Sequence, residues 1–183
     1  MIRTTLSLAL GMAIGAGGLF AWQTFAPHLA QPYAGQDAQR IASLSPSDIE
    51  ALRKGEGWGL AKPAELNDHP GPLHVIELAE EIELTGDQRA KVEASFAAMR
   101  AAAMEAGEAL IEAERALDRG FEAGGLDQPG LRALIARAEA ARAKLREVHL
   151  AAHLEVAPLL SAEQRERYAA LRGYGDGAHH GGH

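Results

Sequence analysis

The sequence predicts an all-α protein built around one long antiparallel helical hairpin with short flanking helices. Apolar and small residues recur at steps of three and four over two long stretches. A break containing Gly and Pro separates these stretches. Alanine is abundant and aromatic residues make up only 5% of the chain, which favours close helix packing over a thick aromatic core.

The chain begins with an apolar segment. Arg3 precedes an almost uninterrupted apolar run over residues 6–25. Residues 1–26 are therefore predicted to be a signal peptide or an N-terminal membrane anchor. In both cases positive charge stays inside and the rest of the chain is exported. We expect a periplasmic protein, held in the inner membrane by residues 6–25 if this segment is not cleaved.

Residues 27–72 are predicted to form a linker with one short helix. Ser45 is placed to cap this helix and Pro46 suits its first position. The helix is expected to end near Gly55, because Gly- and Pro-rich sequence typical of loops follows as far as Pro72.

Residues 73–172 are predicted to form the hairpin domain. We expect a short helix over 73–83, a first arm over about 88–119 and a return arm over about 128–157. Pro158 should end the return arm, because proline lacks the N–H that a helix interior needs. Two arms of similar length joined by a short loop must pack antiparallel.

The chain ends with a predicted helix over 162–172 and a flexible His- and Gly-rich tail over 173–183. A hairpin of two helices buries little apolar surface by itself. We therefore expect a homodimer, the commonest form of assembly that would cover the remaining apolar surface.

Two of the predicted helices begin with the same sequence motif. Residues 84–88 (LTGDQ) and residues 160–164 (LSAEQ) both follow the pattern Leu-[Ser/Thr]-x-x-Gln. This spacing predicts a capping box, in which the hydroxyl accepts a hydrogen bond from the backbone three residues on and the glutamine reaches back to the cap. Residues 44–48 (LSPSD) are a looser copy.

Composition excludes several classes of function. The formal net charge is −7 and no Lys/Arg cluster is present, so nucleic acid is a poor candidate partner. The absence of cysteine excludes a disulfide framework, a thiol nucleophile and a thiolate metal site. No motif of a nucleotide-binding or hydrolytic enzyme occurs, and we expect no enzymatic activity.

Histidine is the one unusual chemical resource of the chain, with eight residues. His149 and His153 are four residues apart on the return helix, on one face and within reach of one metal ion. His74 and Glu77 also share a helix face. The antiparallel arrangement returns the end of the second arm toward them, so the two pairs are expected to converge.

Further candidate metal ligands are His69, His179, His180 and His183. His69 lies in a Pro-rich loop, and the other three form a tail that resembles a metal-scavenging tract. Histidine and glutamate ligands suit divalent Zn, Cu, Ni or Co, and the sequence leaves the identity of the metal open. A surface or packing role is the alternative for each histidine.

The export segment, the hairpin and the motifs at 84–88 and 160–164 together resemble the bacterial periplasmic LTxxQ-motif family. The resemblance covers residues 73–172, and Ser161 replaces the usual threonine. The family includes Spy and CpxP stress proteins, zinc-associated ZraP proteins and CnrX-like heavy-metal sensors. The resemblance implies an all-α hairpin that dimerises into a curved cradle and has no enzymatic activity.

The resemblance implies two alternative functions. Members either bind heavy metals in metal resistance or envelope stress and report to a membrane signalling partner, or act as ATP-independent refolding holdases on unfolded client proteins. CnrX-like sensors use His and Glu ligands, including a long-helix His with Met four residues on; here His153 follows His149. The upstream His-x-x-x-His is missing. The anchor, the histidine pair and the tail favour heavy-metal binding, with the holdase as the alternative.

Overall fold

The computed structural model describes Tyr33 and residues 39–174. The chain divides into two compact units, Met1–Ala38 and Gln39–His183. All regular secondary structure in the described residues is helical, which confirms the predicted fold class. The apolar segment 6–25 and the three histidines of the tail lie outside the described residues. Within the part that is described, no helix combines the length and the apolar character needed to cross a membrane.

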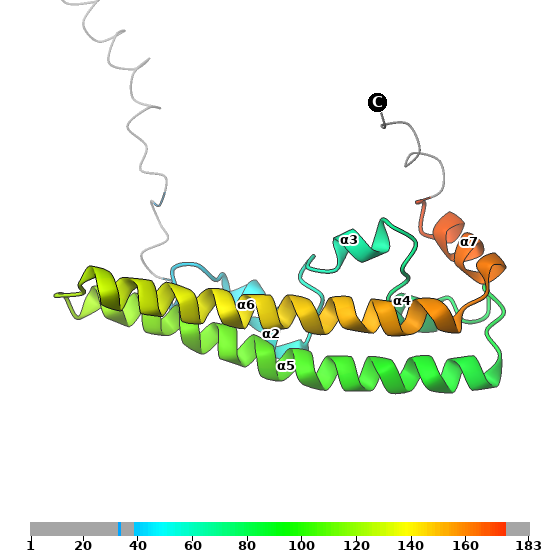
Figure 1. Ribbon diagram of the computed structural model, residues 1–183, viewed down its shortest axis with the longest axis horizontal. Coiled ribbons are helices and arrows are strands. Elements are labelled where there is room, and N and C mark those ends of the chain that lie inside the picture. Colours follow the sequence, from blue (N-terminus) through cyan, green and yellow to red (C-terminus); the bar gives the residue numbers. More distant parts are fainter. Residues whose placement is uncertain (1–32, 34–38, 175–183) are drawn as a thin grey trace, which may run out of the picture. The chain divides into compact units, whose positions relative to one another are not determined.

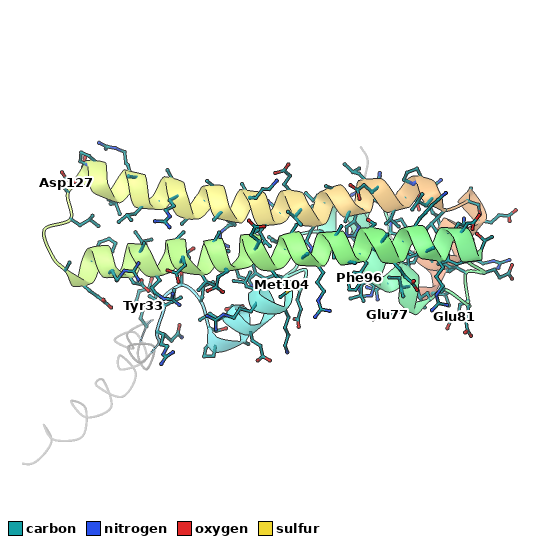
Figure 2. The ribbon with its side chains drawn as sticks, turned by 90° about the horizontal axis from the view of Figure 1, so that it is seen from below. Tyr33, Glu77, Glu81, Phe96, Met104 and Asp127 are labelled. Atoms are coloured by element: carbon teal, nitrogen blue, oxygen red, sulfur yellow. The ribbon has the colours of Figure 1, made fainter. Side chains whose placement is uncertain are left out.

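The predicted hairpin consists of α5 (Gly86–Glu122) and α6 (Gln128–Val156), which lie side by side along their length (Figures 1 and 2). The 37 residues of α5 span about 55 Å at 1.5 Å per residue. At the tip, the Asp127 side chain caps α6 by accepting a hydrogen bond from the Gly130 N–H at 2.8 Å. The buried residues of the two apolar stripes include Val92, Ala103, Ala106, Leu110, Ala138, Leu145 and Ala152.

Helix α2 (Pro46–Lys54) packs against α5 at a glycine. A Cβ atom at Gly107 would stand 2.6 Å from the carbonyl oxygen of Leu52, so the two backbones approach as closely as they do only because residue 107 has no side chain. Ser45 caps α2, as the sequence predicts, and Gly55 ends it with a φ of 69°. The first hydrophobic cluster contains Ile41, Leu44, Leu52, Ala103, Ala106, Leu110, Ile111 and Leu145.

The buried carboxylate of Glu114 links the two arms of the hairpin to each other and to the segment before α2. Glu114 is only 5% exposed, and it accepts hydrogen bonds from Arg142 at 3.0 Å and from the Ser43 hydroxyl at 2.8 Å. The Arg142 guanidinium also lies 5.2 Å from the centroid of the Trp58 ring, within cation–π range. Removal of Arg142 would leave an uncompensated buried charge, which is strongly destabilising.

Two short helices differ from the sequence-based expectation. Helix α3 (Lys62–Glu65) lies in the stretch expected to be a loop. The helix predicted over 73–83 is shorter, because α4 (Pro72–Glu77) is followed by turns. Glu83 has a φ of 54°, a left-handed conformation through which an α-helix cannot continue.

Beyond α6, a 3₁₀ turn, η2 (Ala157–Leu159), leads into α7 (Ala162–Leu171) at the open end of the hairpin (Figure 1). Pro158 lies in η2, where its missing N–H prevents α6 from continuing. A second hydrophobic cluster forms here from Val75, Ile82, Val92, Val156, Leu160 and Tyr168. Both clusters lie within residues 39–183, so this unit has a hydrophobic core of its own, as a domain that can fold independently requires.

Both predicted capping boxes are present at the starts of α5 and α7. The Gln88 N–H donates to the Thr85 hydroxyl at 3.2 Å, and Gln88 Oε1 accepts from the Thr85 N–H at 3.0 Å. The corresponding distances between Ser161 and Gln164 are 3.1 and 2.9 Å. The local role that the sequence predicts for these motifs is confirmed.

The same two glutamines also bind each other. Gln88 Nε2 donates to Gln164 Oε1 at 2.8 Å, and Gln164 Nε2 donates to Gln88 Oε1 at 3.0 Å. Each Nε2 also donates to the carbonyl just before the other motif, to Leu159 at 2.7 Å and to Glu83 at 3.2 Å. We call this reciprocal pair the glutamine clasp. It uses every amide donor of both side chains, and it closes the open end of the hairpin.

Replacement of Gln88 by glutamate separates the clasp from the capping box. Glutamate still closes the box, but it cannot donate to Gln164 or to the Leu159 carbonyl. We expect Gln88→Glu to lower the free energy of unfolding of residues 39–183 by about 2–3 kcal/mol in urea denaturation. Thr85→Ala, which removes only the hydroxyl cap, should cost about 1 kcal/mol. No loss of stability in Gln88→Glu, with a loss only in Thr85→Ala, would mean that Gln88 acts only as a cap.

Candidate functional site

An open cavity of about 790 Å³ lies between the hairpin and the chain segment that precedes α5. Helices α5 and α6 form one wall, and the loop after α2, helix α3 and the start of α4 form the other. Its polar lining residues are Lys54, Glu56, Lys62, Glu65, His74, Arg100, His149, His153 and Tyr174. Three of the predicted ligands, from two distant parts of the sequence, therefore share one cavity.

His149 is a buried imidazole with an unused nitrogen. The residue is 2% exposed, and its Nε2 has no hydrogen-bond partner within residues 39–174. Burial lowers the pKa of the ring below its usual value, and the neighbouring His153 lowers it further, while a hydrogen bond with the backbone of Glu56 opposes both. His149 is therefore neutral at pH 7, and its buried Nε2 carries a lone pair that no group within residues 39–174 uses.

His153 is fixed in a similar way one helical turn further on. It is 5% exposed, and its Nδ1 lies 2.7 Å from the carbonyl oxygen of His69. A carbonyl oxygen only accepts, so Nδ1 carries the hydrogen of this bond, and Nε2 is the ring nitrogen that is left for a ligand. A metal-binding histidine is commonly oriented by such a bond from its other ring nitrogen.

Glu65, on α3, supplies a carboxylate to the same cavity. Both of its oxygens accept hydrogen bonds from the Tyr168 hydroxyl, at 3.0 and 2.9 Å, and Oε1 also accepts from the Gly71 N–H at 3.1 Å. Burial and the negative charge of Glu65 raise the pKa of the Tyr168 phenol, so the hydroxyl remains a donor. The carboxylate is thus held in place from two sides.

Gly71 brings this carboxylate and His153 together. A Cβ atom at residue 71 would stand 2.9 Å from Glu65 Oε1, 2.9 Å from His153 Nε2 and 2.7 Å from His153 Cε1. Both donor atoms thus face the same small space, and a side chain at Gly71 would displace at least one of them. Sequence reasoning missed Glu65, because nothing near α3 in the sequence indicates that it reaches α6 and α7.

The other candidate ligands are placed less favourably. His74 lines the cavity, but its Nδ1 is 2.8 Å from Glu77 Oε2, and Glu77 is not part of the lining. The His69 ring bonds the Asn67 carbonyl at 2.6 Å and lines a second cavity, of about 550 Å³. His179, His180 and His183 lie outside the described residues.

The cavity therefore presents two imidazole nitrogens and one carboxylate, which are donors that suit Zn, Cu(II), Ni or Co. As these side chains stand, no three His, Asp or Glu residues within the described part of the chain are grouped closely enough to hold a metal ion. Two observations nevertheless fit a metal ion: the types of donor atom that these residues carry, and the buried Nε2 of His149, which has no hydrogen-bond partner in the described residues.

The depressed pKa of His149 makes stability depend on pH. In the unfolded chain this histidine binds a proton below its usual pKa of about 6.5, whereas the folded state resists protonation until the pH is lower. Stability should therefore fall as pH drops from 7 to 5. With a chelator present, we expect His149→Gln to show a smaller fall in Tm over this range than the unaltered protein. Equal falls would show that His149 does not titrate in this window.

Comparison with known protein families matches residues 73–172 to the LTXXQ motif family. The match covers more than half of the chain, and it includes both capping boxes, the glutamine clasp and the two buried histidines. No curated protein and no solved structure is similar enough to match. Members of the family are typically non-enzymatic. The chain belongs to the LTXXQ motif family of Spy/CpxP-like periplasmic proteins.

Proposed function

We propose that this protein is a periplasmic heavy-metal sensor that binds a divalent transition metal through His149 and His153, with Glu65 as the third ligand. One observation carries the proposal: the buried Nε2 of His149 has no hydrogen-bond partner within residues 39–174, and His153, one turn further on, uses Nδ1 to bond the His69 carbonyl and keeps Nε2 for a ligand. This arrangement fixes the tautomer that metal binding requires.

The ligand types restrict which metal ions this site would bind. Two imidazoles and a carboxylate favour Zn, Cu(II), Ni or Co over Mg or Ca, which prefer oxygen ligands, and the absence of cysteine disfavours Cu(I). Hydrogen bonds to Glu65 from Tyr168 and Gly71 would orient the carboxylate as a ligand. A small rotation of one side chain, with water in the remaining positions, would complete the site.

The position of the ligands suggests how binding would be reported. Glu65 belongs to α3, whereas both histidines belong to α6, so one ion would fasten the segment before α5 to the hairpin. In a homodimer anchored through residues 6–25, such a change could pass to a membrane signalling partner. The dimer, the anchor and the partner are parts of this proposal, and the family to which the chain belongs is commonly oligomeric or client-binding.

Calorimetric titration of Zn, Cu, Ni and Co into residues 39–183 tests the metal site. To remove the tail as a competitor, His179, His180 and His183 are replaced by alanine. We expect a saturable site with micromolar or tighter affinity and one ion per chain or per dimer. His149→Ala/His153→Ala should abolish it, and Glu65→Gln should weaken binding about 10–100-fold, in the range seen when a supporting or weaker ligand is lost.

His69→Ala is the matched control, because the His69 ring lies at a different cavity and should not affect binding. Circular dichroism of each variant verifies that it is folded. Metal binding that disappears with the tail histidines alone, or that survives the His149→Ala/His153→Ala change, would contradict the proposal.

The second candidate function is that of an ATP-independent holdase. Large apolar side chains that are exposed along the hairpin favour it, including Met104, which Figure 2 labels on α5. The others on α5 and α6 are Phe121, Ile135 and Leu154.

A client assay tests the holdase. If these side chains hold unfolded proteins, residues 39–183 should suppress aggregation of an unrelated client at near-stoichiometric ratio without metal or ATP, as followed by light scattering. Replacement of Phe121 and Ile135 by serine should reduce this suppression. Unchanged suppression in that variant, or none in the unaltered protein, would count against the holdase.

A further inference from the structure

The cavity that holds His149 and His153 is much larger than a metal ion requires. Its volume of about 790 Å³ lies within the range of about 300–1,000 Å³ that is typical of small-molecule sites in proteins. The three proposed metal ligands account for one part of its lining. The other lining residues can therefore bind a ligand other than the metal ion.

Much of this remaining lining is apolar. Phe96 and Met99 on α5 are half-buried, and Figure 2 shows Phe96 on the half of α5 toward the open end of the hairpin. Leu66 and Leu73 line the cavity from the opposite wall and are 49% and 43% exposed. Large apolar side chains that surround a hollow and remain in contact with water gain free energy when an apolar ligand covers them.

Glycine keeps the hollow open. Gly57 and Gly59 line the cavity, and a Cβ atom at either position would meet nothing within 4 Å. At these two positions the loop after α2 presents bare backbone to the cavity, and no side chain fills the adjacent space. Ala61, the next small residue of this wall, adds only a methyl group.

The cavity also contains cations without a carboxylate partner. Arg100 donates from Nε to the Lys54 carbonyl at 3.2 Å, which fixes its side chain at the end of α2. Lys54 pairs with Glu50 at 2.6 Å. Among the ion pairs of residues 39–174, none involves Arg100 or Lys62. The positive charges of Arg100 and Lys62 are therefore available to an anion.

We propose that this cavity binds a small amphipathic carboxylate, such as a medium-chain fatty acid. Its apolar chain would lie against Phe96, Met99 and the two leucines, and its carboxylate would lie at the guanidinium of Arg100. Lys62 adds positive charge at long range. This site uses no donor atom of His149, His153 or Glu65, so it does not depend on the proposed metal function.

Titration of decanoate into residues 39–183 tests the proposal, at concentrations below micelle formation and with a chelator present. We expect saturable binding of one decanoate per chain. Decyltrimethylammonium, which has the same chain and the opposite charge, should bind at least about tenfold more weakly, and so should hexanoate, which has a shorter chain. Equal binding of the cationic analogue, or no saturable binding of decanoate, would overturn the proposal.

Two variants locate the ligand. Leu73→Asp should weaken decanoate binding at least about tenfold, because it removes an apolar contact and adds a negative charge. Ile135→Asp is the matched control, since Ile135 is 45% exposed and does not line the cavity. Leu66→Asp replaces the first variant if Leu73→Asp fails to fold. An unchanged affinity in the leucine variant would place the ligand elsewhere and contradict the proposal.

Arg100→Gln tests the carboxylate contact. It should weaken decanoate binding and leave the binding of uncharged decanol unchanged. An equal effect on both ligands would show that Arg100 does not bind the head group. Binding that appears only after residues 175–183 are deleted would show that the chain's own tail fills the cavity, and this also overturns the proposal. Because the metal titration is separate, failure of decanoate to bind leaves the metal result unaffected.

Discussion

The reciprocal hydrogen bonds between Gln88 and Gln164 are the interaction on which the rest of the structure depends. Each side chain oxygen closes its own helix cap, and each amide nitrogen binds the partner motif, so one residue type performs a local and a long-range task at once. The two residues are 76 positions apart. Because α5 and α6 have no covalent link at this end of the hairpin, the clasp determines where α7 packs.

The position of α7 in turn determines the wall of the cavity. Tyr168 on α7 holds Glu65, and Glu65 holds the backbone N–H of Gly71. Gly71 then leaves space for the ring of His153, which bonds the chain at His69. The motif that gives the family its name is therefore coupled, through a short series of hydrogen bonds, to the two buried histidines.

The sequence predicted the parts of the fold that depend on periodicity and local capping, which are the hairpin, α2 and the starts of α5 and α7. It also predicted that the pair of His74 and Glu77 converges with the pair of His149 and His153, because the return arm ends near the start of the first arm; of these four, Glu77 does not line the shared cavity. It did not predict the clasp, α3 or Glu65. These features arise from contacts between residues far apart in the sequence, for which a glutamine cap or a lone glutamate gives no local signal. The helix predicted over 73–83 was too long, because the apolar pattern continues beyond Glu77 whereas the backbone turns there and is left-handed at Glu83.

Hydrogen–deuterium exchange of Gln164→Glu in residues 39–183 is the most direct test of this coupling. The variant keeps an acceptor for the cap of α7, but it cannot donate to Gln88 or to the Glu83 carbonyl. We predict faster exchange both in α7 and in residues 62–76, which carry Glu65 and Gly71. Ser161→Ala, which removes only the hydroxyl cap, should affect only the first turn of α7. Faster exchange of Gln164→Glu confined to α7, with residues 62–76 unchanged, would contradict the claim that the clasp holds the cavity together.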